Sequence, residues 1–595
     1  MAHARRPLKI RLIFGACLVI AGAAGAMFIV RKTAPPNYSN RPTVENFVLL
    51  DHLGRAHELY RYRDKKAIVI IAQGTGCPII QKSYPLIKTL VEKYSESGIE
   101  FLLFNASSQD TRSALQKEAV EFGINVPILK DRAQIIVDSL GFTRTTEAVV
   151  IVPEKWKMVY RGAIADYFDY SGKSSSQRIY LDEVLGEILS NKRVSVAETE
   201  AKGCALEQDE RLIAFSEVAP IFKKRCLYCH GTLGIRPTNM HTESEIKGWS
   251  AMIREVIRTD RMPPWAPDPE IGKLILDGSL QPTEAHALVK WIEQGAHFES
   301  DRKPVQLDDP KPIEFGPPDL ELIAQAPQTL MPEQPSGYYA FDLGRAAKEI
   351  RIKRIMMRDK GASRAAHHFE LLYSDTPLST ELASKALDQG NSDLILASND
   401  AMQFPPGTYY SIPKDSFLYI RGHYEATGKP ERIQPRAKIW FAKPTDRLKQ
   451  KVVYITKPRF KIPPGQVVTL KSQVKTLQPV YLSQCGAHMH WRGTAAKISV
   501  RSGSGPSIPI ISFPRMTPAR QRTFAFKDLI YLNEGSSIEA ELEYDNTANN
   551  PLNPDPAAWV NSGPFLANEM FRVKCFYQMD PEQSASDFPV FSQSE

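Results

Sequence analysis

The residues best suited to carry chemistry in this chain form the stretch Cys226-Leu-Tyr-Cys229-His230. Two cysteines three positions apart share one face of a helix, so both thiols can bond to the vinyl groups of one porphyrin while the adjacent imidazole meets the iron. A zinc site or a thioredoxin-type motif would need a second cysteine pair or a preceding strand, and neither is apparent nearby. We therefore expect one covalently bound haem c.

A haem iron held by His230 has a second axial position, for which a methionine sulfur is a common ligand. Met262 lies in Arg261-Met-Pro-Pro-Trp265, where two prolines exclude a helix and favour a rigid loop. Met240, Met252 and His241 are the alternatives, and we expect Met252 in the core of a helix. The sequence favours Met262 as the second axial ligand.

The histidines of the C-terminal half fall into three groups: His367-His368, His423 and His488-Met-His490. These five are all the histidines after residue 310, out of 12 in the chain. His488 and His490 are two apart, so they share one face of a strand and can chelate one metal ion. His367 and His368 point to opposite faces unless the strand has a bulge there.

The order of these motifs resembles that of the type II copper monooxygenases, the family of peptidylglycine α-hydroxylating monooxygenase and dopamine β-hydroxylase. The resemblance extends to Gln403-Phe-Pro-Pro-Gly407 and to Asn568-Glu-Met570. It implies two copper ions on two β-sandwiches. The implied ligands of an electron-transfer copper are His367, His368 and His423, and those of a catalytic, oxygen-activating copper are His488, His490 and Met570.

The same resemblance implies an oxidoreductase that hydroxylates a C–H bond of a small-molecule or peptide substrate with O₂. Electrons would come from a periplasmic donor through the haem. The positions with which peptide-hydroxylating members grip a carboxylate hold Gly486 and Lys574 here, so a peptidylglycine substrate is not expected. If both catalytic ligand motifs reach one copper, Cys485 and Cys575 approach each other and are expected to form a disulfide in an exported protein.

Cys77 lies between a strand-like run, Ala67–Ala72, and a helix-like run, Leu86–Tyr94. With the strand predicted at 99–104, the helix at 111–122 and the hairpin at 148–162, this order resembles the thioredoxin-like redoxin and alkyl hydroperoxide reductase family. Ile80 replaces the second cysteine of the family motif, and Thr145-Thr146 stands where a cis-proline is usual. Cys77 therefore has no local disulfide partner. It is either a reactive thiol at a helix N-terminus, a disulfide partner of Cys204, or part of a vestigial docking domain.

Leu12–Val30 is an uncharged run of 19 residues, which at about 1.5 Å per residue crosses the ~30 Å hydrocarbon layer once. Four basic residues precede the run and two follow it at once, which favours a cytoplasmic N-terminus. We expect a single-pass anchor in a bacterial inner membrane with the other domains in the periplasm, where haem is attached covalently. A cleaved signal peptide is the alternative.

These patterns predict a multidomain chain: a cytoplasmic stub and transmembrane signal anchor (1–38), an α/β thioredoxin-like redoxin domain (39–200), an all-α cytochrome c domain (205–300), two jelly-roll-like β-sandwiches of the copper monooxygenase type (312–445 and 446–582) and a tail (583–595). Basic residues exceed acidic ones by only 8 in 595, without basic–aromatic clusters, so we expect no nucleic-acid partner. Two other functions remain open: a copper and haem relay in a membrane complex, and a thiol oxidoreductase or peroxidase centred on Cys77.

Overall fold

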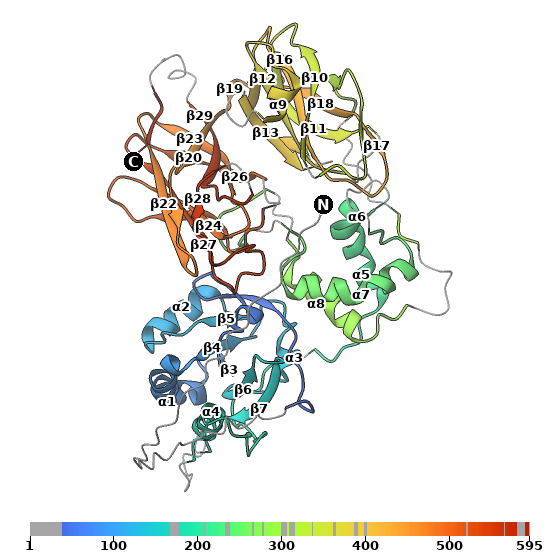
Figure 1. Ribbon diagram of the computed structural model, residues 1–595. Helices are drawn as coiled ribbons and strands as arrows, with labels where there is room; N and C mark the ends of the chain where they lie inside the picture. The colour runs from blue at the N-terminus through green and yellow to red at the C-terminus, as the bar shows by residue number, and fades with distance from the viewer. Residues whose placement is uncertain are drawn as a thin grey trace, which may run out of the picture.

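The computed structural model describes residues 38–593, except 167–177, 208, 232–237, 265–266, 276–278, 299–305, 309–315, 336, 361–364, 386–390, 398–400, 519–521, 564–565 and 580–588. The chain forms an α/β domain, a helical region and a mainly β region, so it is multidomain as predicted (Figure 1). Within these residues no helix is both long enough and apolar enough to cross a membrane. The predicted anchor at Leu12–Val30 lies outside them.

A seven-stranded sheet with the order β2-β1-β5-β4-β3-β6-β7 forms the centre of the α/β domain. Its strands are β1 Val48–Asp51, β2 Ala56–Glu58, β3 Ala67–Ala72, β4 Ile99–Asn105, β5 Ile128–Lys130, β6 Glu147–Val152 and β7 Lys157–Ala163. β3 is buried along its whole length because apolar clusters cover both faces of the sheet. This explains why β3 reads as a continuous apolar run, and the predicted strands and hairpin are confirmed.

Helices α1 Pro78–Tyr94, α2 Arg112–Glu121 and α4 Tyr180–Leu189 pack on one face of this sheet, and α3 Val137–Leu140 packs on the other. The sequence predicted that the first helix begins at Leu86, but it begins at Pro78. Proline is disfavoured inside helices, so the sequence favours a start after Pro85, which in fact lies within α1. Pro78 occupies the first helical position, where the missing N–H costs nothing. The earlier start makes Cys77 the residue immediately before the helix.

The helical region contains α5 Phe215–Ile221, a π-helical turn at Phe222–Cys226, α6 Leu227–His230, α7 Glu243–Arg258 and α8 Pro282–Glu293. Phe215, Phe222 and Trp291 pack together at its centre. The expected core position of Met252 is wrong, since its side chain is 54% exposed. Met252 is on the solvent side of α7, whereas Ile246 and Ile253 face the core.

The β region consists of four larger sheets that pack two by two. In the first pair, β10-β16-β12-β13 faces β19-β15-β11-β18-β8, and one apolar core lies between them. The strands are β8 Leu320–Ile323, β10 Gly337–Arg345, β11 Ile350–Asp359, β12 Ala366–Ser374, β13 Asn391–Ala397, β15 Thr408–Ile412, β16 Phe417–Tyr424, β18 Pro435–Phe441 and β19 Leu448–Lys449. Strand β14 Ala401–Gln403 pairs with β11, β9 Gln328–Leu330 pairs with β17 Glu431–Ile433, and α9 covers Thr380–Lys385.

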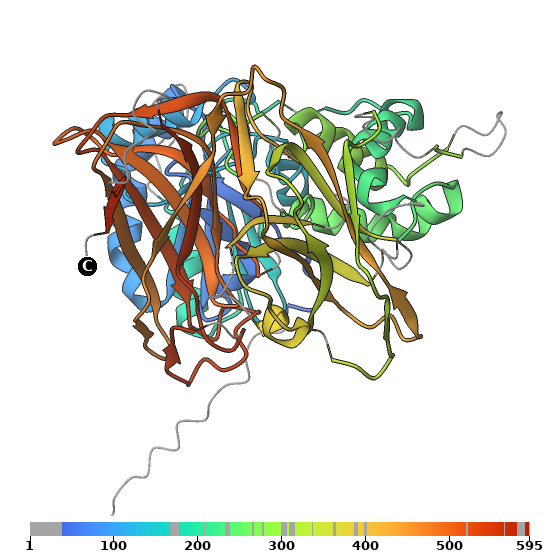
Figure 2. The same ribbon diagram turned by 90° about the horizontal axis from the view of Figure 1, so that it is seen from above.

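In the second pair, β20-β29-β23-β26 faces β25-β24-β27-β22-β30. The strands are β20 Lys451–Thr456, β22 Val467–Thr476, β23 Val480–His488, β24 Gly493–Arg501, β25 Ile508–Phe513, β26 Phe524–Leu532, β27 Ser537–Asp545, β29 Arg572–Gln578 and β30 Phe591–Gln593, with a small pair β21 Lys461–Ile462 and β28 Val560–Asn561. β30 lies in the predicted tail but extends this sheet by pairing with β22. The two sandwiches lie side by side, and Phe576 of the second packs on Phe404 of the first (Figure 2).

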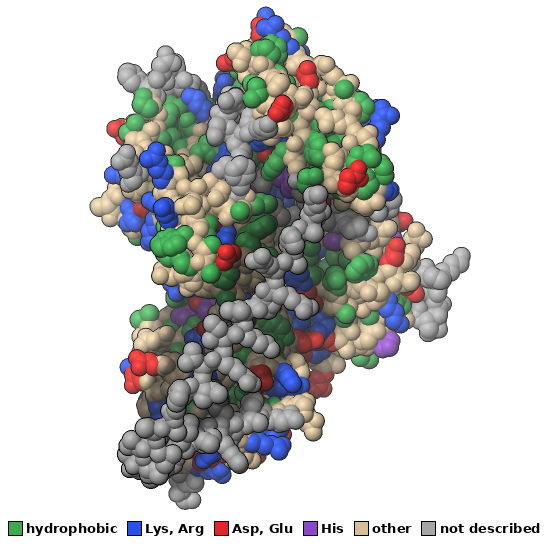
Figure 3. Space-filling model, viewed as in Figure 1, with side chains coloured by type: hydrophobic (Ala, Val, Ile, Leu, Met, Phe, Trp, Pro, Cys, Tyr) green, Lys and Arg blue, Asp and Glu red, His purple; other side chains and the backbone are tan. Residues whose placement is uncertain are grey.

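The loop between α7 and α8 connects three parts of the chain. Its Asp268 is buried and accepts two hydrogen bonds from Arg112 of α2, at 2.5 and 3.0 Å. The Asp268 N–H donates to the carbonyl of Ser512 in β25 at 2.8 Å. The α/β domain, the helical region and the second sandwich therefore meet at one residue, Asp268, through its carboxylate and its backbone N–H. On the face in Figure 3, acidic and basic side chains are interspersed and neither sign dominates.

Candidate functional sites

Cys77 lies at the end of the α/β sheet where β3 leads into α1. Its side chain is 6% exposed. The Cys77 sulfur lies 2.7 Å from the sulfur of Cys204 and 3.1 Å from the hydroxyl oxygen of Thr145. The structure places Cys77 and Cys204 side by side but records no disulfide between them, so the pairing that the sequence raised as one alternative stays a prediction.

Cys204 belongs to a short extended segment, residues 203–206, which we call the Cys204 segment. The N–H of Thr145 donates to the carbonyl of Cys204 and the N–H of Leu206 donates to the carbonyl of Thr143, both at 2.9 Å. The N–H of Cys204 donates to the Thr145 hydroxyl oxygen at 2.9 Å. The Cys204 segment therefore lies antiparallel to residues 143–145, like an added strand.

Gly203 makes this close approach possible. A Cβ atom at position 203 would lie 1.8 Å from the carbonyl oxygen of Thr145. That separation is about half of an ordinary carbon–oxygen contact, so a larger residue would force the two backbones apart. The glycine thus allows Cys204 to reach Cys77.

The surroundings of Cys77 favour its thiolate. Burial raises the pKa of the Cys77 thiol, but hydrogen bonds from Cys204, Thr145 and the Ile80 backbone lower it by more, so the pKa lies below its usual value. The Thr145 oxygen accepts a hydrogen bond from the N–H of Cys204, and because a thiolate can only accept, the Thr145 hydroxyl donates to the Cys77 sulfur when Cys77 is ionised. A thiolate is the reactive form of cysteine, and Thr145 orients both partners.

The cysteines of the Cys226–His230 motif lie at a largely apolar cavity, and an apolar lining with a few polar groups is typical of cofactor sites. Cys226, Cys229, His230, Met240 and Met262 all line it. Burial raises the pKa of the Cys226 thiol to about 12. The lining residues include two cysteine sulfurs and an imidazole, the groups that a covalently bound porphyrin would need.

The imidazole ring of His230 is hydrogen-bonded through Nδ1 to Thr238. Its Nδ1 donates to the carbonyl of Thr238 at 3.2 Å and also contacts the Thr238 hydroxyl. Such a bond at Nδ1 fixes the ring orientation of a histidine that ligates a metal through Nε2. Met262 and Met240 both line the cavity, and Met240 also packs in the apolar core. The preference for Met262 over Met240 stays a prediction.

The first histidine group lies where β12 pairs with β16. His368 is the direct cross-strand partner of His423, and the register shifts between Ala366 and His368. The bulge that joint ligation by His367 and His368 requires is therefore present in the backbone; the His367 side chain lies outside the described part. The rings of His368 and His423 are 5.2 Å apart.

Tyr338 is a further member of this group. Its ring stacks on His423 with 4.8 Å between centroids, and its hydroxyl lies 3.3 Å from Nε2 of His368. Tyr338 pairs with His423 across β10 and β16. The two are far apart in sequence, so no local pattern could have identified Tyr338.

The second histidine group lies at the end of β23. His488 is the last residue of the strand, and His490 lies just beyond it, so the prediction that both share a strand face is only half right. Their rings are nevertheless 5.3 Å apart. The Nδ1 of His490 donates to the carbonyl of Asn568 at 3.1 Å, which brings the segment of Met570 alongside.

Glu569 stabilises the turn at residues 490–492, which follows β23. Its carboxylate is fully buried and accepts hydrogen bonds from the N–H groups of His490, at 3.0 Å, and Arg492, at 2.6 Å. Burial raises the pKa of Glu569 to about 7. Glu569 positions His490 through its backbone, a role that the sequence alone did not reveal.

Among the described side chains, no three from His, Cys, Asp or Glu converge as they would around a metal ion. The predicted ligand set of the first copper includes His367, whose side chain is not described, and that of the second copper includes a methionine, Met570. Neither set could therefore form a described group of three such residues. Each described site therefore contributes a pair of neighbouring imidazoles, and the copper ligand sets remain predictions.

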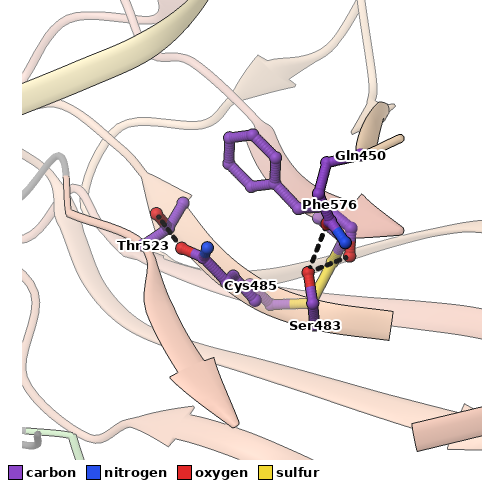
Figure 4. The surroundings of a disulfide bond; sticks show 7 residues. Gln450, Ser483, Cys485, Thr523 and Phe576 are labelled. Atoms are coloured by element: carbon purple, nitrogen blue, oxygen red, sulfur yellow. Dashed lines mark hydrogen bonds between the residues drawn. A yellow bond between two sulfur atoms is a disulfide. The ribbon is translucent and has the colours of Figure 1, made fainter. Parts of the chain in front are cut away.

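The predicted disulfide between Cys485 and Cys575 is confirmed. The two residues face each other across β23 and β29, with Cα atoms 4.2 Å apart, and their sulfurs are bonded. Next to the bond, the Ser483 hydroxyl donates to the Gln450 side chain at 2.6 Å (Figure 4). The disulfide joins neighbouring strands three residues before His488 and five residues after Met570.

Comparison with known proteins finds relatives of the domain that contains Cys77. Residues 39–167 match the Redoxin family. The chain is 28% identical over 114 residues to a thiol-disulfide oxidoreductase ResA of Halalkalibacterium halodurans, which covers 19% of this chain and 62% of that protein. It is 28% identical over 139 residues to the ResA of Bacillus thuringiensis, covering 22% of this chain and 77% of the relative.

Two solved structures are also similar in part. One is an uncharacterized conserved protein from Geobacillus kaustophilus, with 20% identity over 29% of this chain and 93% of that chain and a TM-score of 0.27. The other is peroxidoxin BcpB from Mycobacterium tuberculosis, with 19% identity over 20% of this chain and 81% of that chain and a TM-score of 0.18. Together with the sheet order around Cys77, the family match leads to one conclusion: residues 39–167 are a redoxin domain of the thioredoxin-like type.

Proposed function

We propose that the chain acts as a thiol–disulfide oxidoreductase and that Cys77 is its attacking thiol. The observation that carries this proposal is the position of Cys77 immediately before α1, with the Thr145 hydroxyl 3.1 Å from its sulfur. The match to the Redoxin family and the printed names of the ResA relatives support the same chemistry. This support makes the thiol function our first choice over a copper monooxygenase.

In the proposed reaction the Cys77 thiolate attacks one sulfur of a substrate disulfide and releases the other sulfur as a thiol. The hydrogen bonds from Thr145 and from the α1 backbone stabilise the negative charge before the attack. The chain contributes a lowered pKa at the nucleophile, and the substrate contributes the leaving group.

The test is turnover by the full chain. A disulfide-bonded peptide is mixed with dithiothreitol, and the rate of peptide reduction is measured with the unaltered chain and with Cys77→Ser. We expect Cys77→Ser to lower the catalysed rate at least 100-fold, while Cys17→Ser, which changes a cysteine that precedes residues 39–167 in sequence, leaves the rate unchanged. Full activity in Cys77→Ser would refute the proposal.

The helical region is the proposed site of one covalent haem c. Cys226 and Cys229 would bind the porphyrin and His230 the iron, with Met262 as the second axial ligand. The shared cavity and the Thr238 contact behind His230 support this assignment. A haem here would supply one-electron transfer. In protein matured in a haem-attaching host, Met262→Ala should lower the haem reduction potential whereas Met240→Ala should not, and the reverse result would exchange their roles.

Copper binding by the two sandwiches is the second candidate. The paired imidazoles of His368 and His423, and of His488 and His490, support it, because imidazole is a good copper ligand. The finer proposals are C–H hydroxylation with O₂ or, without a substrate, electron relay. Metal analysis should find two coppers per chain, with one lost in His423→Ala and the other in His488→Ala. A chain that binds no copper would exclude both.

We also propose that the chain is anchored in a bacterial inner membrane with its domains in the periplasm. The uncharged run Leu12–Val30 and the haem motif support this location. Fractionation after alkaline washing should leave the chain in the membrane pellet, and deletion of residues 12–30 should release it.

A further inference from the structure

We propose that Cys204 is the second cysteine of the redox couple at Cys77, so that the segment leading to the helical region resolves the intermediate formed on Cys77. The inference rests on the proposed thiol–disulfide function. It assigns a role that the family motif gives to a neighbouring cysteine to one that is 127 residues away.

A local partner is absent because position 80 holds isoleucine. Ile80 is fully buried in the apolar cluster beneath α1 and has no exchangeable group. A mixed disulfide on Cys77 therefore needs a thiol from elsewhere. The Cys204 sulfur lies 2.7 Å from the Cys77 sulfur, so a bond of about 2.05 Å requires only a small movement.

The position of Cys204 is built by specific contacts. Three hydrogen bonds of 2.9 Å join the Cys204 segment to Thr143 and Thr145, and Gly203 allows the close approach. Thr145 contacts both sulfur-bearing residues. A fixed approach of this kind raises the effective concentration of the second thiol far above that of a free one.

The same contacts predict the order of events. Cys77 is only 6% exposed and the half-buried Cys204 lies 2.7 Å from its sulfur, so the Cys204 segment covers part of the attacking thiol. The segment must move aside for a substrate disulfide to reach Cys77. It then returns, and Cys204 meets the sulfur of the mixed disulfide.

The exchange balances without any further oxidant. In the first step Cys77–S⁻ and R–S–S–R′ give Cys77–S–S–R and R′–S⁻, which takes up a proton. In the second step Cys204–S⁻ attacks the Cys77 sulfur, so that the Cys77–Cys204 disulfide forms and R–S⁻ leaves. The substrate disulfide is reduced by two electrons and the cysteine pair is oxidised by two. A dithiol donor then reduces the pair.

The experiment uses the full chain and oxidised glutathione as the probe. After equilibration, acid quenching and alkylation, trypsin separates Cys77 and Cys204 onto different peptides, which mass spectrometry identifies. The unaltered chain should show a Cys77–Cys204 disulfide and little glutathione on Cys77. In Cys204→Ser the glutathione adduct on Cys77 should rise at least tenfold. Gly203→Ala, which keeps both thiols, should raise it as well.

Three results would overturn the inference. In one, Cys204→Ser and Gly203→Ala both retain full turnover and gain no adduct, while Cys77→Ser is inactive; the proposed function then stands without Cys204. In another, the Cys77–Cys204 disulfide resists excess dithiothreitol in the folded chain, as a structural bridge would. In the third, Cys77→Ser is fully active, which refutes the proposed function itself.

Discussion

The substitution Gly203→Ala tests how the chain brings its two distant thiols together. The Cβ of the alanine would lie 1.8 Å from the carbonyl oxygen of Thr145, and relief of this overlap to an ordinary contact of about 3.3 Å requires the two backbones to separate by ~1.5 Å. The two hydrogen bonds of 2.9 Å between Thr145 and Cys204 would then exceed hydrogen-bonding distance.

The expected cost follows from those contacts. Each neutral hydrogen bond contributes about 0.5–1.5 kcal/mol, so the loss of two should weaken docking of the Cys204 segment by about 1–3 kcal/mol. That corresponds to a roughly 5- to 150-fold lower equilibrium constant for the Cys77–Cys204 disulfide. For a two-electron couple the reduction potential should become less negative by about 20–65 mV.

The assay is equilibration of the full chain in glutathione buffers of graded redox potential, with the fraction of Cys77–Cys204 disulfide measured after alkylation. Gly186→Ala is the matched control, because a Cβ at position 186 in α4 meets no atom within 4 Å. The control should leave the potential unchanged and stabilise α4 by up to about 1 kcal/mol. If both variants keep the original reduction potential, close docking of the Cys204 segment does not determine the potential of the Cys77–Cys204 disulfide, and the reasoning is refuted.

Three further predictions concern other contacts. Thr145→Val keeps the side-chain shape but removes the hydroxyl, so the pKa of the Cys77 thiol should rise; the thiolate is lost as pH falls through the folded-state pKa, and the alkylation midpoint should therefore move to higher pH. Replacing Cys485 and Cys575 by alanine should destabilise the second sandwich by about 2–5 kcal/mol, seen in calorimetry as a shift of one transition. Arg112→Ala leaves a buried carboxylate unpaired where three domains meet, which should cost about 3–5 kcal/mol and increase the rate of proteolysis between the domains.

Several features of the sites could be predicted from local sequence. The spacing of Cys226, Cys229 and His230 indicated one shared helix face, and the three residues line one cavity. The strand at 67–72 and the hairpin at 148–162 were predicted because a short apolar run is a signal contained within a few residues. The need for a bulge beside His368 followed from the same two-residue period.

Other predictions were wrong where local pattern and packing disagree. Met252 is apolar and was expected in the core, but it faces solvent because α7 packs through Ile246 and Ile253. Residues 591–593 seemed to belong to a tail, but their backbone completes the edge of a sheet by pairing with β22. Both outcomes depend on contacts with distant segments: the side of α7 that packs on the other helices, and the unpaired edge that β22 offers to residues 591–593.

Several strands, the Cys226–His230 motif and the grouping of the histidines could be recognised in the sequence, because each depends on residues a few positions apart. The sequence also showed that Cys77 lacks a neighbouring thiol, but only raised Cys204 as one alternative. The folded chain was needed to show that Cys204 lies beside Cys77, that Tyr338 stacks on His423, and that Thr145 contacts both Cys77 and Cys204. The physical reason is that contacts between distant segments depend on the packing of whole elements, and no local preference records which elements will meet.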